Sequence, residues 1–330
     1  MREIGSEFWD VPTCDDRNFL FPNGMEWFLS GRSALKAIVQ EIKEKTKSVS
    51  LPSWCCDSII RPFLEAGMEV SFYTVMGAEQ YLENITTDAV LVMDFFGYTG
   101  YSHIENYNGI VIRDVTHSLF SNSYNDAEYY FGSLRKWAGF YTGGYACGFK
   151  RSLLQLPENE EYVRLRREAM GAKKAYINGT TDSKDYLKTF DQAENMLEHC
   201  GIELMDKRDY DYVRKLNAKF IRDSRCSNAQ ILLNAFNDIA VFKSFNEQDC
   251  PMFVPIMVPD GRRNKLRQYL IEHQIYCPVH WPISRYHRLT SKERFIYDNE
   301  LSLVCDQRYN SDDMYCIIDT INQFLTQTSC

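Results

Sequence analysis

Residues 110–150 read IVIRDVTHSLFSNSYNDAEYYFGSLRKWAGFYTGGYACGFK, and the interpretation of the whole chain starts from them. The apolar run IVI leads to a single carboxylate, Asp114. A second apolar run ends at Phe131 and is followed by Ser133 and Lys136, and a third run follows a pair of glycines. Short apolar runs bounded by turn residues predict strands. Two strands that carry an acid and a lysine to their ends indicate a cofactor site.

The chemistry of such a site uses these residue types. A lysine forms a Schiff base only when its amine is neutral, and partial burial lowers its pKa toward that state. An acid such as Asp114 can keep a pyridine nitrogen protonated, which is its role in pyridoxal-phosphate (PLP) sites. Ser133 and nearby glycines can present a hydroxyl and backbone N–H groups to a phosphate. We expect the lysine to be surrounded by Tyr130, Phe131, Trp137 and Phe140. From this stretch alone, an ordinary surface lysine remains an open alternative.

Composition narrows the class of protein. The chain has 330 residues, which suggests two domains. Its 45% hydrophobic and 25% charged residues are typical of a soluble globular protein. The net charge of −8 and the absence of a Lys/Arg block argue against nucleic-acid binding as the main activity. No stretch approaches the roughly twenty apolar residues of a membrane span.

The cysteines and the first residues bear on location. The eleven cysteines include no CxxC pair, so we expect neither a redox motif nor a metal site. The first ten residues, MREIGSEFWD, are polar and acidic and do not resemble a signal peptide. We therefore expect a cytoplasmic protein whose cysteines are mostly small buried hydrophobes.

The order of elements predicts the architecture. After an extended arm at residues 1–27, apolar strands alternate with helices up to residue 150, which favours a mostly parallel sheet with helices on both faces. Residues 152–218 are charged and mostly helical, and we interpret their charges as solvated helix faces. A smaller α+β domain follows. We expect a large α/β domain with the arm over 1–215 and a small domain over 216–330.

One turn and one helix start add to the candidate site. Ligands of parallel sheets bind beyond the carboxyl ends of the strands, where Asp114, Ser133 and the turn Gly31–Ser33 are expected to meet. Ser33 is a residue type favoured near a helix N-terminus, whose free N–H groups can bind phosphate, and Arg32 adds a positive charge. A capped helix that binds nothing is the alternative for this turn.

The segments SGRSAL, LPSWCCDSIIRPFLEAG, RDVTHS, SLRKW, GGY, SRCSN and PVHWP occur in this order along nearly the whole chain. In this order they resemble the DegT/DnrJ/EryC1/StrS aminotransferases. The resemblance implies the PLP-dependent transferase fold of type I, with a seven-stranded type of sheet. It also implies an aminotransferase that uses PLP, and the family is best known for aminating nucleotide-linked keto-sugars.

Carried over residue by residue, the resemblance assigns roles around the cofactor. It implies that Lys136 is the Schiff-base lysine and that Asp114 is the partner of the pyridine nitrogen. His117 matches a family His or Gln near the ring hydroxyl, and Thr116 matches a small residue against one ring face. Ser133 matches a phosphate-binding serine.

At the phosphate and the second ring face the chain departs from the family pattern. Arg32 and Ser33, after Gly31, fall where the family usually has Thr and Ala at the phosphate. Cys56 occupies the position of the usual ring-stacking aromatic, and Trp54, two residues earlier, is the candidate to replace it.

Asn228 resembles an asparagine that reaches the phosphate from the other subunit, so the resemblance implies a homodimer with shared active sites. Elsewhere, His280 and Trp281 either line the mouth of the site or pack within a loop.

The leading hypothesis is a transaminase that moves an amino group from an amino-acid donor to a keto acceptor, expected to be a keto-sugar. The alternative is a catalytically silent protein of the same fold with a regulatory or scaffold role, which the missing aromatic favours and the pair Lys136 and Asp114 opposes. Relatives that dehydrate sugars carry histidine in place of the lysine, so Lys136 argues against that branch. A nucleotide-binding protein is disfavoured because neither a GxGxxG nor a Walker loop is present.

Overall fold

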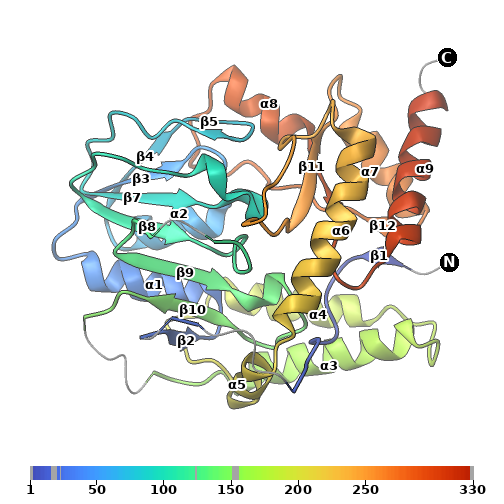
Figure 1. The fold of residues 1–330 in the computed structure, drawn as a ribbon. Coiled ribbons are helices and arrows are strands. Elements are labelled where there is room, and N and C mark those ends of the chain that lie inside the picture. Colours follow the sequence, from blue (N-terminus) through green and yellow to red (C-terminus); the bar gives the residue numbers. More distant parts are fainter. Residues whose placement is uncertain (1–2, 16–20, 23, 123–124, 151–155, 328–330) are drawn as a thin grey trace.

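The computed structural model describes residues 3–15, 21–22, 24–122, 125–150 and 156–327. Its centre is a seven-stranded sheet in the order β2-β10-β9-β8-β7-β3-β4 (Figure 1). The strands are β2 (Glu26–Phe28), β3 (Ser48–Pro52), β4 (Glu69–Tyr73), β7 (Ala89–Met93), β8 (Ile110–Asp114), β9 (Tyr129–Ser133) and β10 (Gly144–Cys147). Pairing is parallel from β4 across to β9, while β10 runs antiparallel to both of its neighbours. The predicted α/β class with a mostly parallel seven-stranded sheet is confirmed.

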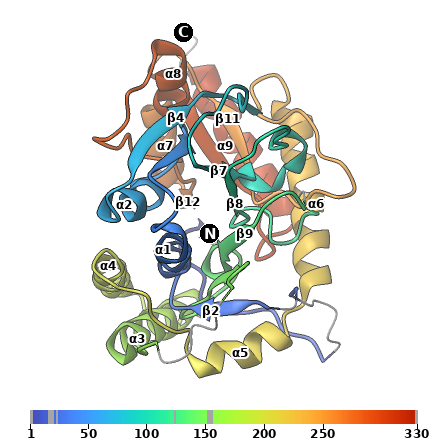
Figure 2. The same ribbon diagram turned by 90° about the vertical axis from the view of Figure 1, so that its left-hand side faces the viewer.

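Helices α1 (Gly31–Ile42) and α2 (Asp57–Glu65) lie on one face of this sheet (Figure 2). Helix α1 forms because Leu35, Ile38, Val39 and Ile42 recur at helical spacing, and all four are buried. Its N-cap is Ser30, whose hydroxyl accepts a hydrogen bond from Ser33 N at 3.2 Å. The cap therefore lies three residues before the serine that the sequence suggested.

The charged helical segment packs below α1 as the hairpin α3 (Glu160–Ile177) and α4 (Tyr186–Leu197) (Figure 2). The interpretation of its charges as uniformly solvated is wrong. The side chain of Arg166 is 1% exposed and that of Lys173 is 0% exposed. Arg166 pairs with Glu194 of α4, and Lys173 pairs with Glu3 of the N-terminal arm at 3.2 Å. Buried charges require such partners, so this hairpin is tied to the arm.

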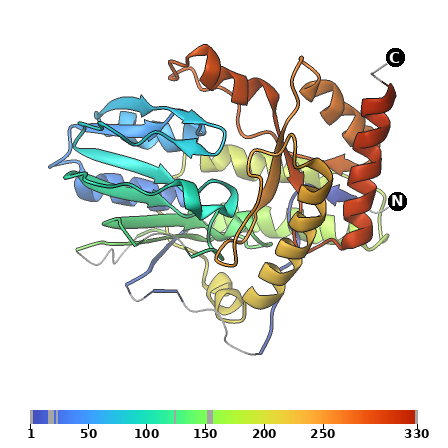
Figure 3. The ribbon, with the colours of Figure 1, turned by 45° about the horizontal axis from the view of Figure 1, so that its top comes forward.

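A second hydrophobic core lies beside the sheet (Figure 3). It is built from α6 (Ala218–Phe236), β11 (Phe253–Met257), α7 (Arg263–Glu272), β12 (Ile275–Tyr276), β13 (Glu300–Val304) and α9 (Ser311–Gln327). The first strand of the chain, β1 (Ile4–Gly5), pairs in parallel with β12, and Ile4 belongs to this core. The domain boundary at residue 216 stays a prediction. Strand β1 belongs to the first part of the sequence but packs in the core formed by residues after 216.

Shorter elements connect these parts. They are β5 (Val75–Met76), β6 (Glu79–Gln80), the 3-10 turns η1 (Phe95–Gly97), η2 (Thr99–Tyr101) and η3 (Leu134–Lys136), and the helices α5 (Lys207–Arg214) and α8 (Ser291–Asn299). Helix α8 packs Ile296 and Tyr297 against the core of the seven-stranded sheet. Within the described ranges, no helix is long and apolar enough to cross a membrane.

Candidate functional site

A cavity of about 230 Å³ lies at the carboxyl edge of the parallel strands, the edge where ligands of such sheets bind. The ends of β8 and β9, the starts of α1 and α2, helix α4 and Trp281 form its wall. Eight of the predicted site residues line it: Gly31, Arg32, Cys56, Asp114, Thr116, His117, Ser133 and Lys136. Residues that are more than one hundred positions apart in sequence are thus brought to one cavity, while their roles stay predictions.

The start of α1 reaches the cavity because glycines let it approach the sheet closely. A Cβ at Gly144 of β10 would lie 2.0 Å from Ser30 O, so a side chain there would push α1 away. A Cβ at Gly31 would lie 3.3 Å from both Gly132 O and Ser133 Cβ. The free N–H groups at the start of α1 are therefore held beside the end of β9.

Asp114 forms the buried end of the cavity. Its side chain is buried at the end of β8, and its Oδ1 accepts a hydrogen bond from Thr116 N at 2.8 Å. Burial raises the pKa of Asp114 to about 6, while the hydrogen bonds from Thr116 act in the opposite direction. A buried carboxyl group with a raised pKa would be stabilised in its charged form by a ligand group that carries positive charge or a proton.

His117 lies beside Asp114 as a neutral imidazole. Its Nδ1 accepts a hydrogen bond from Phe96 N at 3.3 Å, which leaves the ring proton on Nε2. Burial is the main cause that lowers its pKa well below the ordinary value, and His280 and Lys136 lower it further. The ring stacks on Trp281 with centroids 5.9 Å apart. His117 can therefore donate one hydrogen bond from Nε2.

Lys136 differs from expectation in its surroundings. It lines the cavity at the end of η3, but it is exposed in the single chain. Trp137 and Phe140, expected to bury it, instead pack in another core with Leu134 and Ala138. Lys136 is exposed while these two aromatics are buried in that other core, so the prediction that they bury the lysine is wrong.

The backbone next to Lys136 is fixed from two sides. Trp137 donates from Nε1 to Thr116 O at 2.7 Å, which ties η3 to the end of β8. Gln307 donates from Nε2 to Trp137 O at 2.7 Å, and Arg225 of α6 lies over the Trp137 ring at 4.5 Å. The second core of the protein therefore supports the position of the lysine.

Positive charge collects where α1 begins. Arg32 lines the cavity, and its buried Nη1 has no hydrogen-bond partner among the residues that the structure describes. Arg135, also on the wall, pairs with Glu194 of α4, and its buried Nε has no hydrogen-bond partner in the described part of the chain. Ser33 does not line the cavity because its hydroxyl donates to Gly201 O at 2.9 Å. Arg32 rather than Ser33 thus offers a free donor to an anion.

The aromatic on the wall is Trp281, not Trp54. Trp54 is buried behind it, where its ring stacks on Phe95 at 5.0 Å and its Nε1 donates to His280 O at 2.5 Å. Trp54 thereby holds the loop that carries Trp281 into the cavity. Cys56 does line the cavity, and its Sγ lies 2.9 Å from Ser58 Oγ. The PVHWP segment was the signal in sequence that pointed to Trp281.

Asn228 lies outside the cavity, buried on α6. Its Nδ2 donates to the backbone oxygens of Cys305, Asp306 and Tyr309 at 3.0–3.3 Å. These bonds account for its burial within one chain, and the contact with a second subunit stays a prediction. Two further wall residues, Glu194 and Leu197, were not predicted because they come from the charged hairpin.

Neither a family model nor a curated protein matches this chain in sequence. Solved structures do match its fold. The aminotransferase PseC of Helicobacter pylori, involved in the biosynthesis of pseudoaminic acid, has a TM-score of 0.65 and 14% identity over 96% of this chain and 99% of its own.

A DegT DnrJ EryC1 StrS aminotransferase from Brucella abortus has a TM-score of 0.60 and 13% identity over 91% of this chain and 85% of its own. The GDP-4-keto-6-deoxy-D-mannose-3-dehydratase of E. coli, solved with bound hydrated PLP, has a TM-score of 0.59 and 12% identity over 90% of this chain and 87% of its own. At these identities the comparisons show the fold, and the resemblance stated from the sequence is confirmed at that level.

Proposed function

We propose that this protein is a PLP-dependent aminotransferase that moves an amino group from an amino-acid donor to a keto acceptor of the sugar class. The observation that carries the proposal is one cavity that holds Lys136, Asp114, His117 and Arg32 at the carboxyl edge of the sheet. Proteins with the same fold include sugar aminotransferases. Cys56 on the wall is the feature that favoured a silent scaffold protein, and Trp281 on the same wall supplies an aromatic that offsets it.

The residues present fit PLP at each of its functional groups. The buried Nη1 of Arg32 has no hydrogen-bond partner within the described ranges, and the phosphate would accept from it. The hydroxyl of Ser133 would be a second donor to the phosphate. The Asp114 carboxyl, whose pKa burial raises, lacks a cation, which a protonated ring nitrogen would supply. His117 would donate from Nε2 to the ring hydroxyl. Thr116 and Trp281 are the candidates to lie against the ring.

When bound, PLP supplies an electron-withdrawing ring that stabilises negative charge on the substrate carbon. Lys136 Nζ would hold the cofactor until the donor arrives, and would then act as a base that accepts a proton from the substrate carbon and as an acid that gives the proton up on the far side of the transferred nitrogen. Asp114 would keep a proton on the ring nitrogen. Arg32 and Ser133 would fix the phosphate so that the lysine reaches the reacting carbon.

A homodimer and a cytoplasmic location are parts of this proposal. Lys136 is exposed in the single chain, and a second subunit would exclude water from its amine. The described cysteines are free thiols, which suits a reducing compartment.

The test is an absorbance spectrum of the purified protein with added PLP, followed by borohydride reduction and peptide mapping. We expect a visible band and a cofactor fixed to the peptide that contains Lys136. Lys36 of α1, whose Nζ already donates to Cys200 O at 3.0 Å, serves as the internal control and should stay unmodified. Release of 2-oxo acids from a panel of amino acids then identifies the donor. Absence of the band at saturating PLP would refute the proposal.

A further inference from the structure

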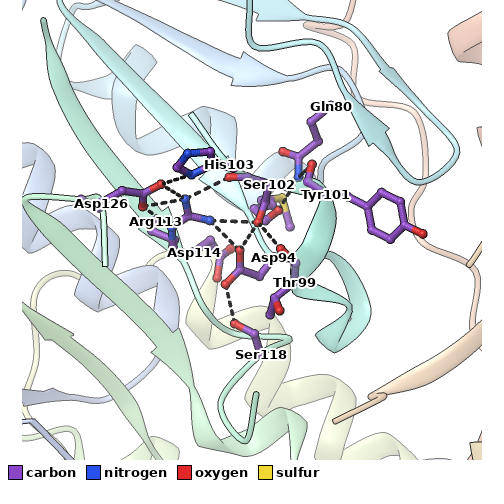
Figure 4. Close-up of polar contacts among 12 residues, drawn as sticks. Gln80, Asp94, Thr99, Tyr101, Ser102, His103, Arg113, Asp114, Ser118 and Asp126 are labelled. Carbon is purple, nitrogen blue, oxygen red and sulfur yellow. Dashed lines mark hydrogen bonds and ion pairs between the residues drawn. The ribbon is translucent and has the colours of Figure 1, made fainter. Parts of the chain in front are cut away.

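Behind the cavity, a buried polar network surrounds Asp94, the residue that follows β7 (Figure 4). Asp94 Oδ1 accepts from Arg113 Nη1 at 2.7 Å and from Ser102 Oγ at 2.6 Å. Its Oδ2 accepts from Ser118 Oγ at 2.8 Å, and its backbone N–H donates to Asp114 O at 3.1 Å. Asp94 and Arg113 are both 0% exposed. A buried carboxylate with charged and hydroxyl donors is fixed in one orientation.

The turn that begins at Asp94 has an unusual backbone. Phe96 is buried and has φ +54°, a left-handed conformation that a bulky side chain rarely adopts. This conformation aims the Phe96 N–H at His117 Nδ1, 3.3 Å away. At the next residue, Gly97, a Cβ would lie 2.0 Å from Cys250 O and 3.0 Å from His117 O. The turn therefore fits closely against His117 and is held in a conformation that needs external support.

Asp94 holds His117 at two points. Its carboxylate binds the hydroxyl of Ser118, the residue next to His117 in the chain, and so fixes the backbone there. Its own turn provides the N–H that binds the imidazole ring. We propose that Asp94 is a positioning residue for the active site, which sets the orientation and the tautomer of His117. The proposal rests on the proposed function for the use of His117, but the tautomer itself is a property of the cofactor-free protein.

A purely structural role would be shared with Asp126, which provides the matched control. Asp126 accepts from Arg113 Nη2 at 2.7 Å and from Arg113 Nε at 2.9 Å, so it pairs with the same guanidinium from the other side. It also lies 3.5 Å from His103 Nδ1 at the surface. Loss of either carboxylate removes one partner of the buried Arg113 (Figure 4). Only Asp94 belongs to the turn whose N–H binds His117.

The experiment compares Asp94→Asn, Ser118→Ala and Asp126→Asn in the cofactor-free protein, with ¹⁵N-labelled histidine observed by NMR at neutral pH. In the unmodified protein we expect one His117 species with the proton on Nε2. Asp94→Asn and Ser118→Ala should convert it to a mixture of tautomers or shift its ring nitrogen signals. Asp126→Asn should leave those signals in place even though it lowers stability. If Asp94→Asn does not fold, Ser118→Ala, which keeps both charges, decides the question.

Unchanged His117 signals in Ser118→Ala and in a folded Asp94→Asn, or equal changes in Asp126→Asn, would overturn the proposal. A second measurement separates it from the proposed function. Asp94→Asn should weaken PLP binding roughly tenfold, the size of one lost hydrogen bond, with Asp126→Asn close to the unmodified protein. If the unmodified protein binds no PLP, the proposed function fails, while the NMR result still decides the role of Asp94.

Discussion

Arg113 and Asp114 are consecutive residues of β8, and their side chains lie on opposite sides of the sheet. Arg113 points away from the cavity into the network with Asp94, whereas Asp114 lines the cavity. Successive residues of a strand face opposite ways, so one strand end carries both a structural cation and a candidate catalytic acid. The charge of Asp94 also contributes to the raised pKa of Asp114, after the larger effect of burial.

Asp114→Asn should stabilise the cofactor-free protein above pH 6. Burial raises the pKa of Asp114 from 3.8 to about 6, so the folded state prefers the neutral acid. This contribution to stability is complete below pH 3.8 and is lost as the pH rises through 6. At one pKa unit per ~1.4 kcal/mol, the loss is about 3 kcal/mol by pH 8. Urea unfolding at pH 8 should therefore give a higher free energy of unfolding for Asp114→Asn than for the unmodified protein. Near pH 4 the two free energies should differ little.

Asp88→Asn is the control for that measurement, because it should have the opposite sign. Asp88 accepts from Lys47 N and Ser48 N, and these bonds lower its pKa. The stabilising contribution of Asp88 is therefore present above its ordinary pKa, so the substitution should not stabilise the protein at pH 8.

With saturating PLP, the gain in stability of Asp114→Asn should disappear, because the unmodified protein alone can pair its carboxylate with the ring nitrogen. An Asp114→Asn protein that is less stable than the unmodified cofactor-free protein at pH 8 would contradict the raised pKa of Asp114.

Lys136→Ala should abolish cofactor trapping without unfolding the protein. An exposed side chain at this position contributes little to packing, so the free energy of unfolding should change by less than about 0.5 kcal/mol. The rate of 2-oxo acid release should fall by at least ~100-fold, because the group that moves the proton is lost. Lys136→Arg keeps the charge and should be equally inactive. Activity retained by either variant would exclude this lysine from the chemistry.

Arg32→Ala should weaken PLP binding without destabilising the cofactor-free protein. The Nη1 atom of Arg32 has no hydrogen-bond partner among the described residues, so its removal breaks no hydrogen bond of that atom there. A charge-assisted hydrogen bond to phosphate is worth ~1.5–3 kcal/mol, which corresponds to roughly 10- to 100-fold in affinity. Titration of PLP by absorbance measures the change. Arg61→Ala, on the outside of α2 beside Glu65, should leave the affinity within about twofold.

Trp281→Ala and Trp54→Ala should have different effects. Trp281 is partly exposed on the cavity wall, so its loss should mainly weaken PLP binding. Trp54 is 1% exposed, and its truncation should cost ~3–5 kcal/mol of stability. Thermal unfolding and PLP titration of both variants measure the two effects. Equal losses of stability would mean that the wall residue is structural.

Much of the fold could be predicted because the strands carry their signal locally. The run Ala89–Met93 is buried at every position and reads as a strand without any information from the rest of the chain. Asp114 and Lys136 could be predicted for a related reason. Asp114 ends the apolar strand β8, and Lys136 ends the turn η3 that follows the apolar strand β9. Side-chain direction could not be read in the same way. Whether Ser33 faces the cavity depends on Gly201, a residue 168 positions away.

Residues from distant segments were the other source of error. Trp281 replaces Trp54 on the cavity wall because a loop from the C-terminal part folds over it. Glu194 lies on a helix whose composition is that of a solvated surface, and only the packing of α4 against Arg135 brings it to the site. The burial of Lys173 likewise depends on Glu3, a residue about 170 positions earlier in the chain. Local patterns carry no information about such partners.

The pairing of β1 with β12 has a consequence for the synthesis of this protein. Ile4 lies opposite Ile275, so the partner strand of β1 is synthesised about 270 residues after β1 itself. At roughly 5–20 residues per second, a ribosome needs on the order of 15–50 s to make that partner. During this time the seven-stranded sheet can assemble, while β1 has no strand to bind. A stalled nascent chain that ends before β12 should therefore lose its N-terminus to protease while the sheet resists. The residues that are made first would be among the last to fold.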